Sequence, residues 1–352
     1  MAKAKKLTKG QQRRIKANHD KKLHSQSSNK KDKVQWLDDD LGLPQEGVVL
    51  SRFGQHADVE NGDKEVYRCN LRRSISSLVC GDKVLWRLGK ESQHSITGVI
   101  EAVHERDSVL SRPDVYDGVK PIAANISQIL IVSSVLPIFN SDIIDRYLVA
   151  AEQTGITPVI VLNKIDLLET ISMAEREHIT QQLKIYQDIG YQVLHASSKS
   201  RDGISELKNQ LSQHTSIFVG QSGVGKSTLV NALMPDLGLL TKEVSENSGL
   251  GQHTTTVARL YHFNDGGDLI DSPGIREFGL WHLTPEQVCH GFIEFEPLLG
   301  LCKFRDCKHQ TDPGCALVAA GESNKISPKR LASFQRILAS LGENKLTSRF
   351  ND

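Results

Sequence analysis

The sequence has few cysteines and no long apolar run, and both absences narrow the class of protein it can be. Six of its 352 residues are cysteine, too few for a disulfide-stabilised scaffold of this length. No run of about 18 apolar residues is present to span a membrane. The basic N-terminus lacks the apolar segment of a secretory signal. We therefore expect a cytoplasmic protein without a membrane partner, in which clustered cysteines favour metal binding over pairing.

The first 33 residues contain almost no apolar side chains and only two acidic ones, Asp20 and Asp32. Twelve Lys or Arg minus these two acids give this segment a charge of +10, and the chain total of +1 leaves −9 for the remainder. Such a segment cannot bury a core, so we expect residues 1–40 to be a disordered tail. Its charge favours an arm that binds nucleic-acid phosphates, although a solubilising tail would have the same composition.

The remaining chain has the composition of a soluble globular protein, with 38% hydrophobic and 24% charged residues. Its first part, residues 41–110, has short β-rich runs separated by Gly, Asp and Asn turn signals: Gly47–Leu50, Val66–Asn70, Asp82–Trp86 and Gly98–Val103. This spacing predicts an all-β domain, an OB-fold barrel. One face could bind RNA through Arg52, Phe53, Arg68, Arg72 and Arg73. Alternatively, Phe53 packs in the core and the arginines are only solvated.

Strand-like and helical patterns alternate in residues 111–278, which predicts a parallel sheet covered on both faces. The expected strands are Ile126–Val135, Pro158–Leu162, Tyr191–His195 and Ser216–Val219, and the expected helices are Ile143–Thr154, residues 172–189 and Ile204–Leu211. Residues 279–352 are expected to be mainly helical. Their last helix should run from Ser327 to Leu341, with Ser327 as its N-cap and Pro328 in the first helical position.

The segment Gly220–Ser227 matches the phosphate-binding P-loop, with a predicted strand before it and a helix, Thr228–Leu233, after it. Its glycines permit a tight turn in which backbone N–H groups face phosphate oxygens at the positive end of the helix. The predicted phosphate-binding residues are Gly220, Gln221, Ser222, Gly223, Val224, Gly225, Lys226, Ser227 and Thr228. Lys226 should reach the β- and γ-phosphates, Ser227 should bind Mg²⁺ and Thr228 should meet the α-phosphate.

A base-reading motif, Asn163-Lys164-Ile165-Asp166, follows a buried strand. The Asp166 carboxylate can accept two hydrogen bonds from guanine, whereas adenine offers no such pair of donors. Asn163 can hold the loop and the Lys164 stem can cover the base. After the next strand, Ser197, Ser198 and Lys199 are typical of the second base-side loop, whose backbone N–H reads guanine O6. These motifs favour GTP over ATP.

Asp271 and Gly274 form a D-x-x-G motif, so Asp271 should hold Mg²⁺ through water and Gly274 should contact the γ-phosphate. A threonine of the preceding loop should complete the Mg²⁺ shell, and we favour Thr255 over Thr254. Ile275 stands where Ras-like proteins have a water-orienting Gln. His253 is the best candidate to orient the attacking water, although it could be an ordinary loop histidine.

Four potential metal ligands, Cys302, Cys307, His309 and Cys315, lie within fourteen positions of one another. Three thiolates and one imidazole suit tetrahedral Zn²⁺ and leave no open position, so we expect one structural zinc ion. The other cysteines, Cys69, Cys80 and Cys289, are isolated in the sequence and are interpreted as ordinary residues.

The base-reading motif precedes the P-loop, the reverse of the order in most small GTP-binding domains. With the barrel, the Gly-Gln-His-Thr-Thr-Thr segment that starts at Gly251 and the Cys/His cluster, the chain resembles the circularly permuted ribosome small-subunit-dependent GTPase A family (RsgA or YjeQ) over nearly its whole length. The resemblance implies a late assembly factor of the small ribosomal subunit that binds rRNA. It also implies subunit-stimulated GTP hydrolysis with His253 as the catalytic residue.

The permuted order suggests a mechanism without the resemblance. The D-x-x-G segment leads directly into residues 279–352, so a movement of Gly274 would be passed to the metal-binding domain. GTP would then fix the relative placement of two RNA-contacting domains, and hydrolysis would release it. Two alternatives remain open: an RNA-binding scaffold with a fixed nucleotide, and a GTPase that acts on tRNA or mRNA. We expect a monomer.

Overall fold

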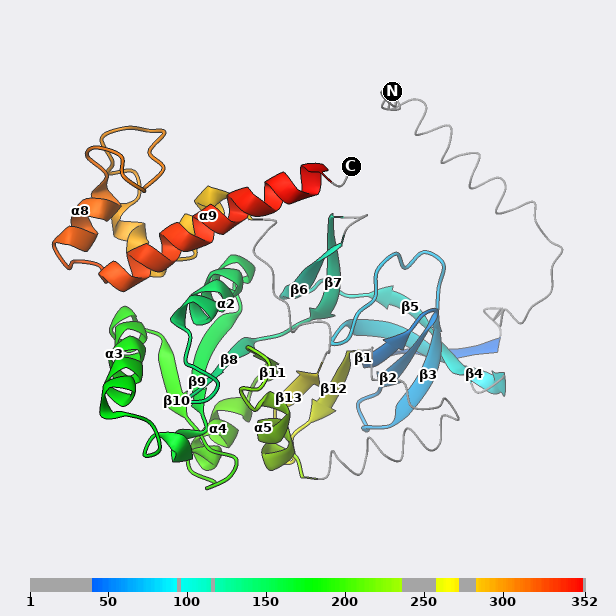
Figure 1. Cartoon of the computed structure of the whole chain (residues 1–352). Coiled ribbons are helices and arrows are strands. Elements are labelled where there is room, and N and C mark those ends of the chain that lie inside the picture. Colours follow the sequence, from blue (N-terminus) through cyan, green and yellow to red (C-terminus); the bar gives the residue numbers. More distant parts are fainter. Residues whose placement is uncertain (1–39, 94–95, 115–117, 236–257, 272–282, 351–352) are drawn as a thin grey trace, which may run out of the picture.

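The computed structural model describes residues 40–93, 96–114, 118–235, 258–271 and 283–350 (Figure 1). Along the chain, these residues form a β-barrel, a sheet with helices on both faces, and a helical unit that contains the Cys/His cluster. None of the helices in these ranges is long and apolar enough to cross a membrane.

The barrel consists of β1 (Leu41–Phe53), β2 (His56–Glu60), β3 (Val66–Leu71), β4 (Lys83–Gln93) and β5 (Ile96–Val103). Its strands follow the order β1-β2-β3-β5-β4, and a second pairing of β1 with β4 closes it. Buried side chains of alternate positions fill the interior, among them Val49, Val59 and the fully buried Trp86. The structure thus confirms the predicted barrel, although β2 was not predicted.

A two-stranded hairpin, β6 (Val109–Asp114) and β7 (Gly118–Ala124), connects the barrel with the next part. Its end is attached to the barrel, because the N–H of Ala124 donates to the carbonyl oxygen of Cys80 at 2.9 Å. Gly81 allows this close approach: a Cβ atom there would lie 2.2 Å from the Ala124 oxygen.

The central sheet contains β8 (Gln128–Ser134), β9 (Thr157–Asn163), β10 (Gln192–His195), β11 (Thr215–Val219), β12 (Arg259–His262) and β13 (Asp268–Asp271). The strand order is β10-β9-β8-β11-β13-β12, and within this order only β12 is antiparallel to its neighbour. Helices α2 (Ser141–Thr154) and α3 (Met173–Ile189) cover one face, and α4 (Ile204–Leu211) and α5 (Lys226–Leu233) cover the other. The predicted alternation of strands and helices is confirmed.

The barrel and the central sheet are continuous. Ser51 of β1 pairs with Arg259 of β12, so that the two sheets form a single sheet of eleven strands (Figure 1). Apolar side chains of both parts, including Leu50, Leu260 and Ile270, belong to one buried cluster. Because β12 and β13 are the strands between the two predicted switch segments, the barrel is built directly onto the strands that flank them.

The helical unit comprises α7 (Pro285–His290), η4 (Ile293–Leu298), α8 (Ala316–Glu322) and α9 (Pro328–Phe350). Three aromatic rings, Phe292, Phe295 and Phe334, form the centre of its core. The first turn of α9 begins where the sequence predicts, since the N–H of Leu331 donates to the carbonyl oxygen of Ser327 at 3.1 Å. Helix α9 continues to Phe350, past the predicted end at Leu341.

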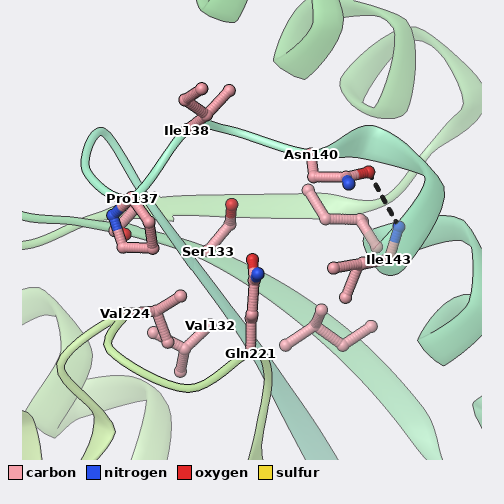
Figure 2. Close-up of a pocket in the computed structure, with 11 residues that line it drawn as sticks. Val132, Ser133, Pro137, Ile138, Asn140, Ile143, Gln221 and Val224 are labelled. Atoms are coloured by element: carbon pink, nitrogen blue, oxygen red, sulfur yellow. Dashed lines mark hydrogen bonds between the residues drawn. The ribbon is translucent and has the colours of Figure 1, made fainter.

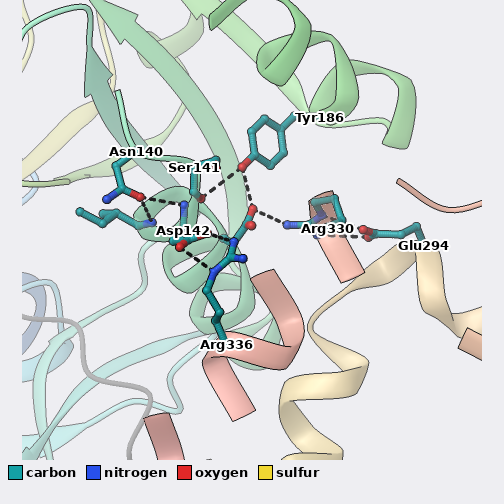
Figure 3. A network of polar contacts seen from close by, with 9 residues as sticks. Asn140, Ser141, Asp142, Tyr186, Glu294, Arg330 and Arg336 are labelled. Carbon is teal, nitrogen blue, oxygen red and sulfur yellow. Dashed lines mark hydrogen bonds and ion pairs between the residues drawn. The ribbon is translucent and has the colours of Figure 1, made fainter. Parts of the chain in front are cut away.

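A buried ionic network joins the helical unit to α2 (Figure 3). Arg330 of α9 donates to Asp145 of α2 at 2.5 Å and, with two nitrogens, to Glu294 of η4 at 2.7 and 3.1 Å. The hydroxyl of Tyr186 donates to Asp145 at 2.7 Å. Nearer the surface, Arg336 of α9 bonds both carboxylate oxygens of Asp142. Helix α2 is therefore the part of the central domain on which α9 is fixed.

Candidate nucleotide site and metal centre

The P-loop turns tightly between β11 and α5, and two of its glycines are sterically required. Gly220 has a φ of +140°, and a Cβ there would lie 2.1 Å from the Val132 oxygen. Gly225 has a φ of +95°, and its Cβ would lie 2.4 Å from Nδ2 of Asn163. Larger residues would fit neither the backbone conformation nor the space. The N-terminus of α5 is thereby brought against the strand that carries the base-reading motif.

Three polar side chains, Lys226, Ser227 and Thr228, begin α5. The ammonium group of Lys226 lies across the loop and donates to the carbonyl oxygens of Gly220 and Gln221 at 2.6 and 2.8 Å. Ser227 and Thr228 are exposed in the first turn of the helix. A cation at the N-terminus of a helix forms an anion-binding arrangement, which fits the predicted phosphate site.

The base-reading motif is hydrogen-bonded to the P-loop. Asn163 is fully buried, and its Nδ2 donates to the Val224 oxygen at 2.8 Å. Lys164 has a φ of +60°, and its Nζ donates to the oxygens of Gly223 and Leu136 at 2.6 and 2.7 Å. Oδ1 of Asn163 is buried without a partner among the described residues. A ligand or water would be expected to satisfy such an atom.

Asp166 is held by the second base-side loop. The hydroxyl of Ser197, which is fully buried, donates to Oδ1 of Asp166 at 2.6 Å. The same hydroxyl oxygen accepts the N–H groups of Lys199 and Ser200 at 3.2 and 3.1 Å. Ser198 is half-buried in the same turn. The sequence indicated only a backbone role for this loop, whereas the structure adds a side chain that fixes the direction of the Asp166 carboxylate.

A small pocket that was not predicted from the sequence lies beside the P-loop, at the carboxyl end of β8 (Figure 2). Gln221 and Val224 of the P-loop contribute to its wall, opposite Asn140 and the start of α2. Oδ1 of Asn140 caps α2 by accepting the N–H of Asp142 at 2.9 Å. The first turn of α2 and the phosphate-binding loop therefore line the same pocket.

The D-x-x-G motif begins at the same edge of the sheet. Strands β11 and β13 are parallel neighbours, with Ile217 opposite Ile270, and Asp271 is the last residue of β13. Both predicted Mg²⁺-site segments therefore leave the sheet at its carboxyl edge. His253, Thr255 and Gly274 lie outside the described residues, as do Thr254 and Ile275. Their predicted roles stay predictions.

The Cys/His cluster has the dimensions of a zinc site. The ligand atoms of Cys302, Cys307, His309 and Cys315 all lie within 4.8 Å of one another. Sγ of Cys302 is 4.0 Å from Sγ of Cys315, and each of these sulfurs is 3.5 Å from Nδ1 of His309. Tetrahedral Zn²⁺ would place two sulfurs about 3.8 Å apart and a sulfur about 3.6 Å from a nitrogen, given the usual bond lengths. This cluster could therefore bind one zinc ion.

Contacts around the Cys/His cluster are suited to metal binding. The N–H of Ala316 donates to Sγ of Cys302 at 3.4 Å, a contact of the kind that orients a metal ligand. Burial lowers the pKa of His309, which favours the neutral ring that a metal requires. Gln335 of α9 donates to the carbonyl oxygen of His309 at 3.3 Å. The loop that contains the Cys/His cluster and helix α9 are thus parts of one unit.

The predicted RNA face of the barrel is less basic than the sequence suggests. Phe53 is 41% exposed beneath the guanidinium of Arg68, so the alternative in which it packs in the core is wrong. Arg68 bonds both oxygens of Asp58, and Arg72 is 2.9 Å from Glu101. Arg52 donates to backbone oxygens, while Arg73 is exposed. Two of the four predicted arginines therefore have carboxylate partners.

Known proteins share this arrangement. A sequence model described as RsgA GTPase matches residues 103–281. The Small ribosomal subunit biogenesis GTPase RsgA of Haemophilus influenzae (strain 86-028NP) is 58% identical over 346 residues, which are 98% of each chain. The crystal structure of YjeQ from Thermotoga maritima has a TM-score of 0.69 at 31% identity and covers 85% of this chain and 99% of its own. That of YloQ, a circularly permuted GTPase, has a TM-score of 0.67 at 26% identity over 86% and 96%. With its P-loop strand placed after its base-reading strand, this chain belongs to the RsgA GTPase family.

Proposed function

We propose that this protein is a GTP hydrolase that acts late in the assembly of the small ribosomal subunit. It binds the rRNA of the subunit and leaves after the subunit has stimulated hydrolysis. The observation that carries the proposal is the direct bonding of a guanine-reading loop to a P-loop through Asn163 and Lys164. This site occurs in a chain that is 58% identical to a protein described as a small ribosomal subunit biogenesis GTPase.

Guanine recognition is assigned to Asp166. Its carboxylate accepts two hydrogen bonds from the base, and Ser197 holds it in the required direction. Asn163 keeps the base-reading loop against the P-loop, so base and phosphate are bound at a fixed separation. The exposed start of α5 supplies the phosphate contacts: backbone N–H groups of the loop, the ammonium of Lys226, and Ser227 for the Mg²⁺ that accompanies GTP.

Hydrolysis is assigned to the two switch segments. Thr255 completes the Mg²⁺ shell, Asp271 holds the ion through water, and the N–H of Gly274 contacts the γ-phosphate. His253 orients the attacking water, because Ile275 has no polar group with which to do so. The intrinsic reaction is therefore slow, and a partner that fixes His253 would accelerate it.

The division into a tail (1–40), a barrel (41–110), a permuted GTPase domain (111–278) and a zinc-binding domain (279–352) is part of the proposal. GTP would fix the barrel relative to the zinc-binding domain. In support, the barrel pairs with β12, and the chain after Asp271 continues to Leu283 in the core of the helical unit. We place the protein in the cytoplasm, as a monomer that binds no membrane.

Sedimentation with purified ribosomal subunits tests the proposal. The full chain should co-sediment with free small subunits at raised salt, but not with large ones, and more tightly with a GTP analogue than with GDP. Equal affinity in both nucleotide states would contradict release by hydrolysis. Binding to tRNA or mRNA alone would favour a GTPase with another target, and an absence of stimulated turnover with any RNA would favour a scaffold.

His253→Ala provides the second test. It should abolish the turnover stimulated by the small subunit while leaving GTP affinity unchanged. His178→Ala, which changes an exposed histidine of α3, is the matched control and should alter neither quantity. Turnover that survives in His253→Ala would show that another group orients the water.

A further inference from the structure

Among the described contacts between the barrel and strand β12, two lie at opposite ends of that strand. One is the pairing of Ser51 with Arg259, next to the apolar cluster that Leu50 shares with Leu260. The other is polar and lies at the opposite end of β12, where His262 contacts Glu60 of β2. Two attachments separated along a strand prevent a rotation that either one alone would allow.

His262 lies between two carboxylates that belong to different parts of the molecule. Its Nδ1 is 2.6 Å from Oδ1 of Asp268, on the neighbouring strand β13. Its Nε2 is 3.0 and 2.8 Å from the two oxygens of Glu60, on the barrel. The Glu60 side chain is 7% exposed, so water cannot readily replace this contact. Strand β13 and the barrel are therefore joined through one imidazole ring.

Both contacts can form only when the ring is protonated. An ionised carboxylate accepts hydrogen bonds, so each ring nitrogen must carry a proton to bond its partner, and only the imidazolium has both. The charged groups that face the ring are Asp268 from β13, Glu60 from β2, and Lys64, whose Nζ is 3.3 Å from Glu60. The hydrogen bond to Asp268 raises the pKa of His262 above its ordinary value, against burial and Lys64, which lower it.

We propose that His262 is a proton-dependent latch that fixes the barrel against β12 and β13. In its neutral form, the ring keeps one N–H for one carboxylate, and the lone pair of the other nitrogen faces the second carboxylate. The barrel then loses its attachment at this end of β12 and keeps those around Ser51 and Arg259 and at Ala124, so that its position relative to β12 is less restricted. Because protonation is favoured in the latched state, the latch is closed at low pH and opens as the pH rises through the raised pKa of His262.

The position of the latch gives it a role distinct from nucleotide binding. His262 pairs with Asp268 at the start of β13, whereas Arg259 pairs with Asp271 at its carboxyl end. The latch is thus at the edge of the sheet away from the P-loop, and opening it would change the orientation of the barrel without removing a ligand of the nucleotide. This inference concerns only the coupling of the two domains and holds whether or not the ribosomal subunit is the partner.

Hydrogen exchange of the full chain, measured by mass spectrometry over a range of pH and corrected for the intrinsic pH dependence of exchange, tests the latch. In the natural protein, exchange in β2 and β12 should accelerate roughly tenfold above the His262 pKa, as expected for the loss of one charged hydrogen bond. His262→Gln should show the faster exchange at every pH. His104→Gln is the matched control, because His104 bonds Glu46 at 2.7 Å within the barrel alone.

Two further measurements guard against a variant that merely folds poorly. Glu60→Gln keeps the volume of the side chain and should also weaken the pH dependence of exchange. The NMR signal of His262, identified among the 13 histidines by its loss in His262→Gln, should titrate above the ordinary value of about 6.5. A His262 that titrates at or below that value, or a natural protein and His262→Gln with the same pH dependence of exchange, would overturn the proposal.

Discussion

Arg330 provides the sharpest test of how the helical unit is held to the GTPase domain. Its side chain is 2% exposed, its guanidinium bonds Asp145 and Glu294, and its charged carbon lies 4.3 Å from the ring centroid of Phe292. Burial disfavours the charged guanidinium, yet Asp145 and Glu294 hold its pKa above the ordinary value. Arg330→Met would keep most of the apolar stem and remove the charge, leaving two carboxylates without their shared partner.

The expected cost follows from the burial of those carboxylates. Removing one member of a buried ion pair destabilises a protein by about 3–5 kcal/mol, because the other charge stays buried without compensation. Here Asp145 is the costly one, since its side chain is 2% exposed, whereas that of Glu294 is 12% exposed and closer to water. Adding Asp145→Asn to Arg330→Met should therefore recover about 2 kcal/mol or more, because the buried charge is then removed.

Calorimetry of the zinc-loaded full chain, combined with hydrogen exchange of α2 and α9, measures this cost without assuming two-state unfolding. Arg336→Met is the matched control, because Arg336 joins the same two helices through Asp142, but these side chains are 55% and 39% exposed. That control should cost under about 1 kcal/mol. Equal costs for Arg330→Met and Arg336→Met, or a double variant no more stable than Arg330→Met, would refute the reasoning.

Three further changes test the sites. Gly225→Ala should weaken GTP binding at least about tenfold, because its Cβ would lie 2.4 Å from Nδ2 of Asn163. Gly155→Ala, the control, changes a glycine with a φ of +68° in open space and should lower stability without changing GTP affinity. Equal GTP affinities of the two variants would contradict this prediction. Ser197→Ala should weaken GTP binding by about 1–2 kcal/mol in a titration, and Ser200→Ala, the control, should not. A chelator should release near one equivalent of zinc, and the amide groups of α8 should then lose their protection against hydrogen exchange. A purified protein that contains no zinc would contradict the site.

The elements that the sequence predicted well are those whose signal is local. The helix Ile204–Leu211 has the predicted bounds, because its apolar residues follow the helical period and Gly203 precedes it. The P-loop and the Cys/His cluster are motifs whose residue types and spacing lie within a short stretch of the sequence. Such features need little knowledge of the rest of the chain.

Features that depend on distant partners could not be predicted. Strand β2 contains Asp58 and Glu60, which are buried only because Arg68, Lys64 and His262 compensate their charge. In the sequence, the same acidic residues indicate a solvated loop. Arg330 likewise belongs to a helix that resembles a surface helix, and its partner Asp145 is 185 positions away. Ion pairs of this kind exist only once the fold has brought their elements together.

Strand β1 pairs with β2, β4 and β12, and these partners are synthesised at very different times. The barrel strands are complete at Val103, whereas β12 begins at Arg259. A chain emerging from the ribosome can therefore close its barrel long before the edge of β1 around Ser51 has a partner. That edge stays open to incorrect pairing during most of synthesis. The nucleotide-binding sheet and the barrel become one structure only when the segment that follows the P-loop helix has been made.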